Sequence, residues 1–215
     1  INITLPYKQK IIPFVDQLVN DAKYTHSVNT ILLDKTNTLI GENTDVYGLQ
    51  AGYLKKIANA DKKKTLVIGA GGVSPSVILS LQKSKINNIA IINRSHDKSI
   101  FLKKKFSGLN VLKWESLEKE ISKFDIIINA TSLGLKDNED FKIDFNNIKE
   151  ESIFIDTIYN PLETKTIKIL KEKNIKTFNG LDMFIYQGQK SFYLWNKVNP
   201  EIDDELINLL TSKLK

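Results

Sequence analysis

A short glycine-rich stretch is the part of the sequence with the plainest chemical use. Gly69-Ala70-Gly71-Gly72 follows an apolar run, 65–68, and precedes a helical pattern with Pro75 in its first turn; a second apolar run, 89–92, comes next. Strand, glycine turn, helix and strand in this order are typical of a unit that binds dinucleotides, because glycines let backbone N–H groups approach a pyrophosphate at a helix N-terminus. A strand-to-helix turn without any ligand would use the same residues, so the turn alone does not decide between the two.

The residues after the second apolar run indicate which dinucleotide to expect. NAD-binding units usually have a carboxylate there, whereas this chain has Asn93, Arg94 and Ser95, with Lys98 one turn later. An arginine and a lysine suit a 2′-phosphate, although a solvated surface pair would look the same. Because both residues follow a glycine turn, we expect NADP rather than NAD.

A second group of residues could move a proton. A lysine beside a carboxylate, close to a nicotinamide, can protonate an alkoxide as a hydride reaches a carbonyl carbon, and Lys8 and Asp45 are candidates for this pair. Their spacing in the sequence alone cannot place Lys8 near Asp45. A surface charge for Lys8 and a helix cap for Asp45 are the alternative interpretations. The two histidines are isolated and the chain has no cysteine, so we expect no metal site.

Short apolar runs alternate with amphipathic helical patterns along most of the chain, which predicts a doubly wound parallel sheet of the α/β class. In such sheets ligands bind at the carboxyl ends of strands, where Gly69, Arg94, Thr131 and Thr157 lie; from Gly180 onward the pattern is helical. The expected strands are residues 1–4, 28–34, 38–41, 65–68, 89–92, 110–113, 124–129, 153–156 and 177–178, and the expected helices are residues 11–19, 46–58, 73–81, 97–106, 115–121, 164–173, 181–196 and 201–214.

Composition excludes several classes of protein. The 215 residues carry a formal net charge of +6, but the lysines are scattered among acidic neighbours, which is typical of solvated helix faces rather than of a nucleic-acid surface. No apolar stretch approaches membrane-spanning length, and the first residues lack the layout of a signal peptide. We therefore expect a cytoplasmic protein without a membrane or nucleic-acid partner.

Eight short motifs, in their order and approximate separation, resemble those of the shikimate dehydrogenase family, and together they span essentially the whole chain. They are Asn2-Ile3-Thr4-Leu5-Pro6-Tyr7-Lys8, Val28-Asn29-Thr30, Asn43-Thr44-Asp45, Gly69-Ala70-Gly71-Gly72, Asn93-Arg94-Ser95, Asn129-Ala130-Thr131-Ser132, residues 156–161, and residues 180–187 followed by Phe192 and Trp195.

The resemblance implies an activity, a cofactor and roles for individual residues. The activity is the reversible, NADPH-dependent reduction of 3-dehydroshikimate to shikimate, with Lys8 and Asp45 as the catalytic pair. The implied substrate contacts are Thr4, Lys8, Asn29, Asp45, Tyr159 and Gln187. The implied cofactor contacts are Gly69, Ala70, Gly71, Gly72 and Val73 at the diphosphate, Asn93, Arg94 and Lys98 at the adenosine phosphate, and Thr157 and Gly180 near the nicotinamide. Ser95 and Thr131 are further implied cofactor contacts.

The resemblance also implies two domains. Residues 46–180 would form a Rossmann-like NADP-binding domain, and residues 1–45 with 181–215 a smaller α/β substrate domain completed by C-terminal helices. The protein would act on a small molecule, as a monomer or a homodimer.

The sequence departs from the family pattern at its start. The family opens with a strand–helix–strand segment whose Ser-x-Ser motif grips the substrate carboxylate, whereas this chain begins at Ile1, directly before the Thr4-Leu5-Pro6-Tyr7-Lys8 motif. We expect a piece of a longer protein rather than a naturally shortened relative. Smaller departures are Val46, where glycine is frequent, and Thr157, where an apolar residue is usual.

Three other functions compete with this interpretation. A quinate/shikimate dehydrogenase with relaxed specificity would share nearly all of the motifs. A truncated protein that binds NADP without turnover would fit the missing serine motif. An enzyme like methylene-tetrahydrofolate dehydrogenase has a similar plan, but Asn43-Thr44-Asp45 and residues 180–187 argue against it.

Overall fold

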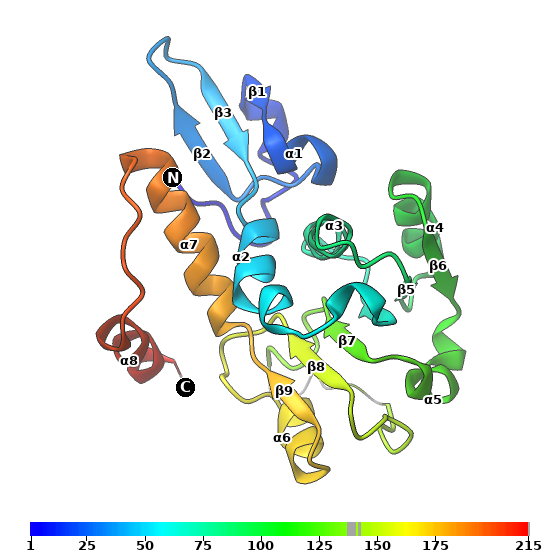
Figure 1. Cartoon of the computed structure of the whole chain (residues 1–215). Helices are drawn as coiled ribbons and strands as arrows, with labels where there is room; N and C mark the ends of the chain where they lie inside the picture. The colour runs from blue at the N-terminus through cyan, green and yellow to red at the C-terminus, as the bar shows by residue number, and fades with distance from the viewer. Residues whose placement is uncertain (137–140, 142, 215) are drawn as a thin grey trace.

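The computed structural model describes residues 1–136, 141 and 143–214, which form a large parallel sheet, a small mixed sheet and the helices around them (Figure 1). All neighbouring strands of the large sheet run parallel. In spatial order its strands are β6 (Leu109–Leu112), β5 (Ile89–Ile92), β4 (Thr65–Ile68), β7 (Ile126–Asn129), β8 (Ile153–Asp156) and β9 (Lys176–Phe178). The order reverses on either side of β4, as in doubly wound sheets.

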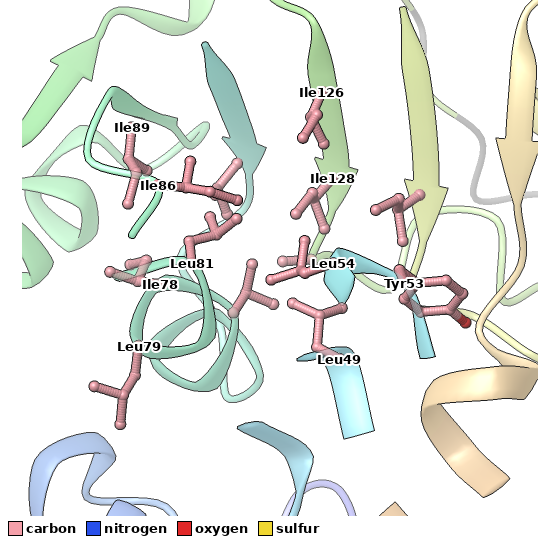
Figure 2. Close-up of a cluster of buried hydrophobic side chains, with 14 of the residues drawn as sticks. Leu49, Tyr53, Leu54, Ile78, Leu79, Leu81, Ile86, Ile89, Ile126 and Ile128 are labelled. Carbon is pink, nitrogen blue, oxygen red and sulfur yellow. The ribbon is translucent and has the colours of Figure 1, made fainter. Parts of the chain in front are cut away.

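The two faces of this sheet bury two separate sets of apolar side chains, because successive strand residues point to opposite faces. Val67 and Ile128 belong to one cluster, together with residues of the helices α2 (Asp45–Gly52), α3 (Ser74–Lys83) and α4 (His96–Lys105). Figure 2 shows part of this cluster, with α3 side chains meeting those of the strands. Leu66 and Phe154 belong to the other cluster, with residues of α5 (Leu117–Glu120) and α6 (Lys165–Glu172). Burial on both faces explains why the central strands read as unbroken apolar runs.

The small sheet lies on the other side of α2. Its strands, in the order β1 (Gln17–Leu18), β3 (Leu39–Glu42) and β2 (Thr30–Leu33), pair in parallel at β1–β3 and antiparallel at β2–β3. The remaining helices are α1 (Asn20–Thr25), α7 (Leu181–Asn196) and α8 (Asp204–Lys213), and the 3₁₀ turns are η1 (Ile12–Phe14), η2 (Leu54–Lys56), η3 (Ala60–Lys62), η4 (Trp114–Ser116) and η5 (Ile121–Lys123).

Helices α2 and α7 pack side by side between the two sheets (Figure 1). Their backbones come close because α2 carries Gly48 at the contact: a Cβ atom there would lie 2.6 Å from the carbonyl oxygen of Met183. This contact fixes the residues of α7 relative to the start of α2, and both helices contribute to the site described below.

The predicted doubly wound α/β sheet is confirmed, whereas three local predictions are wrong. The helix expected over residues 11–19 is instead the 3₁₀ turn η1 followed by strand β1, because the backbone becomes extended at Val15 and β1 pairs with β3. Residues 1–4 form a single bridge, Asn2 with Thr30, rather than a strand. The helix expected over residues 46–58 ends at Gly52 and continues as the turn η2. None of the helices among the described residues is long and apolar enough to cross a bilayer.

Candidate active site

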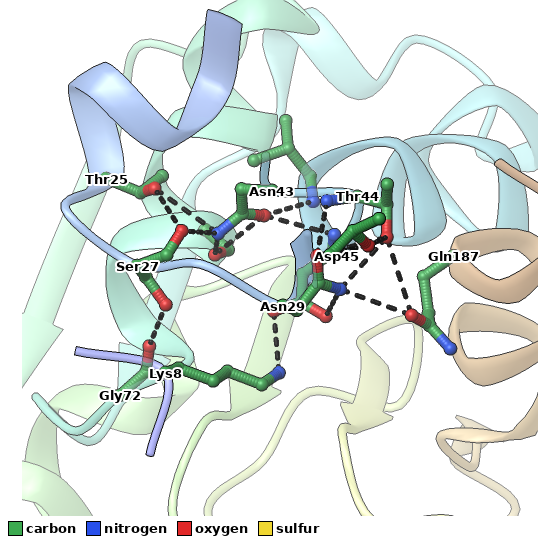
Figure 3. Close-up of polar contacts among 12 residues, drawn as sticks. Lys8, Thr25, Ser27, Asn29, Asn43, Thr44, Asp45, Gly72 and Gln187 are labelled. Atoms are coloured by element: carbon green, nitrogen blue, oxygen red, sulfur yellow. Dashed lines mark hydrogen bonds and ion pairs between the residues drawn. The ribbon is translucent and has the colours of Figure 1, made fainter. Parts of the chain in front are cut away.

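Lys8 and Asp45 form an ion pair, with 2.7 Å between Nζ and Oδ2 (Figure 3). The lysine side chain is 14% exposed and the aspartate side chain 4%, so the surface-charge interpretation of Lys8 is wrong. The helix-cap interpretation of Asp45 is also wrong. Thr44 occupies the N-cap position of α2, and the side-chain oxygen of Asn43 accepts the backbone N–H of Asp45 at 3.0 Å. The Asp45 carboxylate is therefore directed to other side chains.

Asn29 holds the second oxygen of that carboxylate. Its amide nitrogen donates to Asp45 Oδ1 at 2.9 Å and also to Gln187 Oε1 at 3.2 Å, so it links residues from both ends of the chain. The orientation of the amide follows from its oxygen, which accepts the backbone N–H of Thr44 at 2.8 Å. A backbone donor cannot change places with an acceptor, so the amide nitrogen must face Asp45 and Gln187.

Three buried hydroxyls to which the sequence analysis gave no role, those of Thr30, Thr44 and Ser191, support this network. Ser191 Oγ lies 2.7 Å from Thr30 Oγ1 and 3.1 Å from Thr44 Oγ1, and it donates to the carbonyl oxygen of Gln187 at 3.0 Å. Ser191 and Thr44 are both almost fully buried. The sequence held one signal for Ser191, since it lies four residues after Gln187 and thus on the same side of a helix.

A cavity of about 1250 Å³ lies at the carboxyl ends of β4, β7 and β8, and the Lys8–Asp45 pair is in its wall. It brings together most of the residues that the sequence predicted for substrate and cofactor. These are Thr4, Lys8, Asn29, Asp45, Gly69, Ala70, Gly71, Gly72, Val73, Asn93, Lys98, Thr131, Thr157, Tyr159, Gly180 and Gln187. Arg94 and Ser95 do not line this cavity; Arg94 lines a second one of about 260 Å³, which shares Asn93 with the first.

The glycine turn fits a diphosphate. Gly69 has φ +112°, and a Cβ atom there would lie 2.6 Å from Thr131 Cγ2, so the tight turn requires glycine. A Cβ atom on Gly71 would have no neighbour closer than Ala130 O at 4.0 Å and would occupy space that is open beside the turn. The turn leads into the N-terminus of α3, with Pro75 in the first turn as predicted. An open backbone at a helix N-terminus is what an anionic pyrophosphate needs.

A buried carboxylate fixes the wall of the cavity after β8. Asp156 accepts hydrogen bonds from Asn129 Nδ2 at 2.9 Å, Thr164 Oγ1 at 2.9 Å and the backbone N–H of Ile158 at 3.1 Å. Burial raises the pKa of Asp156 to about 6, against the opposite effect of these three donors. The residues that follow Asp156 line the cavity, and the ring of Tyr159 stacks on Phe184 of α7 with 4.4 Å between centroids.

The described residues contain no group of three or more His, Asp or Glu side chains arranged to hold a metal ion. The site therefore consists of an ammonium–carboxylate pair, a polar network and a glycine turn around one cavity. A parallel sheet with a glycine-rich first turn and a cavity at its carboxyl edge defines a dinucleotide-binding α/β protein.

Comparison with known proteins narrows this class to one family. The family described as shikimate/quinate 5-dehydrogenase matches residues 53–179, and the one described as the shikimate dehydrogenase substrate binding domain matches residues 1–31. The chain belongs to the shikimate dehydrogenase family.

Individual relatives agree along nearly the whole chain. The shikimate dehydrogenase (NADP(+)) of Pelagibacter ubique is 45% identical over 210 residues, which are 98% of this chain and 77% of the relative. The crystal structure of shikimate dehydrogenase from Aquifex aeolicus is 36% identical, with a TM-score of 0.86 over 93% of this chain and 73% of that one. The enzyme from Thermus thermophilus, in complex with NADP(H) and shikimate, is 29% identical, with a TM-score of 0.83 over 99% of this chain and 77% of that one.

Proposed function

We propose that the protein catalyses the reversible, NADPH-dependent reduction of 3-dehydroshikimate to shikimate. The observation that carries the proposal is the buried pair of Lys8 and Asp45, 2.7 Å apart in the wall of a cavity that also contains the glycine turn. Proton transfer and hydride transfer to one carbonyl group require these two features to face the same space.

In this proposal Lys8 is the acid that protonates the substrate oxygen. An ammonium has three N–H bonds, and one of them donates to Asp45, so the other two can reach a ligand. NADPH, when bound, supplies a hydride to the carbonyl carbon. Lys8 then gives a proton to the oxygen that receives the electron pair of the C=O bond, and in the oxidation direction it takes this proton back. Asp45 orients the ammonium, and Asn29 orients Asp45.

The substrate would be held by polar side chains around this pair. Thr4, Asn29, Tyr159 and Gln187 line the same cavity as Lys8, and their hydroxyl and amide groups suit the hydroxyls of a polyhydroxylated ring. The cofactor would lie across the glycine turn, with its diphosphate at residues 69–73 and its 2′-phosphate at Arg94 and Lys98. Thr131, Thr157 and Gly180 would border the nicotinamide end, and Asn93 and Ser95 the adenosine end.

The arrangement of the elements supports a division into two domains. Residues 46–180 would form the NADP-binding domain, which contains the large sheet. Residues 1–45 and 181–215 would form the substrate domain, which contains the small sheet, α7 and α8. We further propose a cytoplasmic enzyme that acts as a monomer or homodimer, without a nucleic-acid or membrane partner.

The test is oxidation of shikimate with NADP⁺, followed by the absorbance of NADPH, with NADPH binding measured separately by fluorescence. Turnover of shikimate with NADP⁺ well above that with NAD⁺ or quinate is the expected result. Comparable rates with quinate would favour the relaxed quinate/shikimate enzyme. NADPH binding without any turnover would contradict the proposal and favour a protein that only binds the cofactor.

A further inference from the structure

The second cavity lies beside the main one, and only two of the residues that line it, Asn93 and Arg94, belong to the motifs. Its volume is about 260 Å³, and the residues that line it are Asn93, Arg94, His96, Lys113, Trp114 and Glu115. It lies at the carboxyl ends of β5 and β6, one strand further out than the glycine turn. Ligand pockets usually measure about 300–1,000 Å³, so this cavity suits one ring of a larger ligand.

A hydrogen bond connects this cavity to the glycine turn. The side-chain oxygen of Asn93 accepts the backbone N–H of Ala70 at 3.1 Å, and Asn93 lines both cavities. A ligand that extends from the turn toward β6 therefore passes Asn93 and reaches the second cavity. In the proposed function this end of the ligand is the adenosine half of NADP.

Trp114 has the larger of the two aromatic rings that line this cavity, the other being the imidazole of His96. It begins the 3₁₀ turn η4, which is closed by Ser116 Oγ donating to the carbonyl oxygen of Lys113 at 2.8 Å. Trp114 is half-buried and packs against the core cluster that contains Leu66 and Phe154. This packing limits the indole to few conformations, and a rigid aromatic surface is favourable for stacking because little side-chain entropy is lost on binding.

We propose that Trp114 is the stacking surface for the adenine ring of NADP, and so a cofactor-binding residue outside the sequence motifs. The proposal rests on the proposed function, because it requires the dinucleotide to lie across the glycine turn. Adenine has an exocyclic amino donor and ring-nitrogen acceptors, which suit the carboxylate of Glu115 and the ammonium of Lys113 in the same cavity. Arg94, also in this cavity, remains the residue for the 2′-phosphate.

The experiment uses tryptophan fluorescence in a Trp195→Phe background. The chain has two tryptophans, and Trp195 is partly exposed on α7, where its indole nitrogen donates to Ile31 O. In this background Trp114 is the reporter. Adenosine 2′,5′-bisphosphate should quench the fluorescence in a saturable manner, whereas nicotinamide mononucleotide should leave it unchanged. Binding is measured independently by calorimetry.

Two substitutions separate stacking from packing. Trp114→Phe retains an aromatic ring, and Trp114→Leu retains apolar volume against the core without one. We expect Trp114→Phe to bind adenosine 2′,5′-bisphosphate about as well as its parent, and Trp114→Leu to bind it about 5- to 150-fold more weakly, the range for the loss of one base–aromatic stack. Thermal unfolding of both variants tests whether they fold like their parent.

The outcomes distinguish this proposal from the proposed function. If calorimetry detects binding but the fluorescence does not change, or if the Leu and Phe variants bind equally well, Trp114 is not the stacking surface and the function stands. If NADPH binds the Trp195→Phe protein in calorimetry but adenosine 2′,5′-bisphosphate does not, the adenine site at Trp114 is refuted and the function stands. If NADPH itself does not bind, NADP binding at the glycine turn is refuted, and the inference with it.

Discussion

The buried carboxylate of Asp156 makes a quantitative prediction about stability. Its pKa is raised from 3.8 to about 6 because the folded protein removes it from water. Below pH 3.8 the carboxyl group is protonated in both the folded and the unfolded protein, and its contribution to the free energy of unfolding is at its maximum. This contribution is lost as the pH rises through about 6, the pKa in the folded protein. At about 1.4 kcal/mol per pH unit, the loss between pH 3.5 and pH 7.5 is about 3 kcal/mol.

Asp156→Asn should remove this loss without breaking the local hydrogen bonds. The asparagine oxygen can accept from Asn129 and from the backbone of Ile158, as Asp156 Oδ1 does. The asparagine nitrogen can donate to Thr164 Oγ1, which now donates to Asp156 Oδ2, because a hydroxyl works in either direction. Between pH 3.5 and pH 7.5 the free energy of unfolding of the variant should therefore rise by about 3 kcal/mol relative to that of the wild-type protein.

The assay is urea unfolding of both proteins at half-unit pH steps, with the difference in free energy of unfolding plotted against pH. Other titrating groups cancel in this difference. Glu163→Gln is the control, because the hydrogen bond and charge of Lys171 lower the pKa of Glu163 and its difference curve should have the opposite sign. Parallel stability curves for Asp156→Asn and the wild-type protein would refute the argument that burial dominates at Asp156.

Three further predictions concern the site. Lys8→Ala should lower kcat for shikimate oxidation by orders of magnitude and leave NADPH affinity nearly unchanged, because it removes the acid but no cofactor contact; stopped-flow rates and NADPH fluorescence measure both, and a wild-type rate would exclude Lys8 from the mechanism. Arg94→Ala should weaken NADPH binding far more than NADH binding, and an equal loss in calorimetry would mean that Arg94 does not touch the 2′-phosphate. Gly71→Val should fold normally but bind NADPH weakly, since its side chain enters open space, whereas Gly69→Val should lower the melting temperature because of its positive φ; loss of folding in both would contradict the open space at Gly71.

The parts of the fold that could be predicted from the sequence are those whose signal is local. Strands such as β4 and β8 are buried on both faces and therefore appear as continuous apolar runs. The apolar spacing in residues 11–19 suggested a helix, but the pairing of β1 with β3 outweighs the periodic pattern there. In that region long-range pairing, which the sequence does not display, decides the structure.

The candidate site likewise contains features that have a local sequence signal and features that depend on long-range contacts. The glycine turn is local and could be predicted, whereas the contact of Lys8 with Asp45 depends on how the N-terminal segment returns to α2, and spacing could not place it. The link from Asn29 to Gln187 depends on the close packing of α2 and α7. The second cavity could not be predicted at all, because Arg94 follows β5 and Trp114 follows β6, and no local pattern joins the two.

The hydrogen bond between Asn29 and Gln187 has a consequence for the order in which the parts of the protein fold during synthesis. A chain emerges from the ribosome with its N-terminus first, and a domain that has fully emerged can fold while the residues after it are still being synthesised. Every strand of the large sheet has been synthesised before α7 begins at Leu181. Asn29 and Thr44 obtain Gln187 and Ser191 as partners only when α7 emerges. The nascent protein can thus assemble its dinucleotide-binding sheet first, and it acquires the complete polar network around the reactive lysine only after α7 has been synthesised.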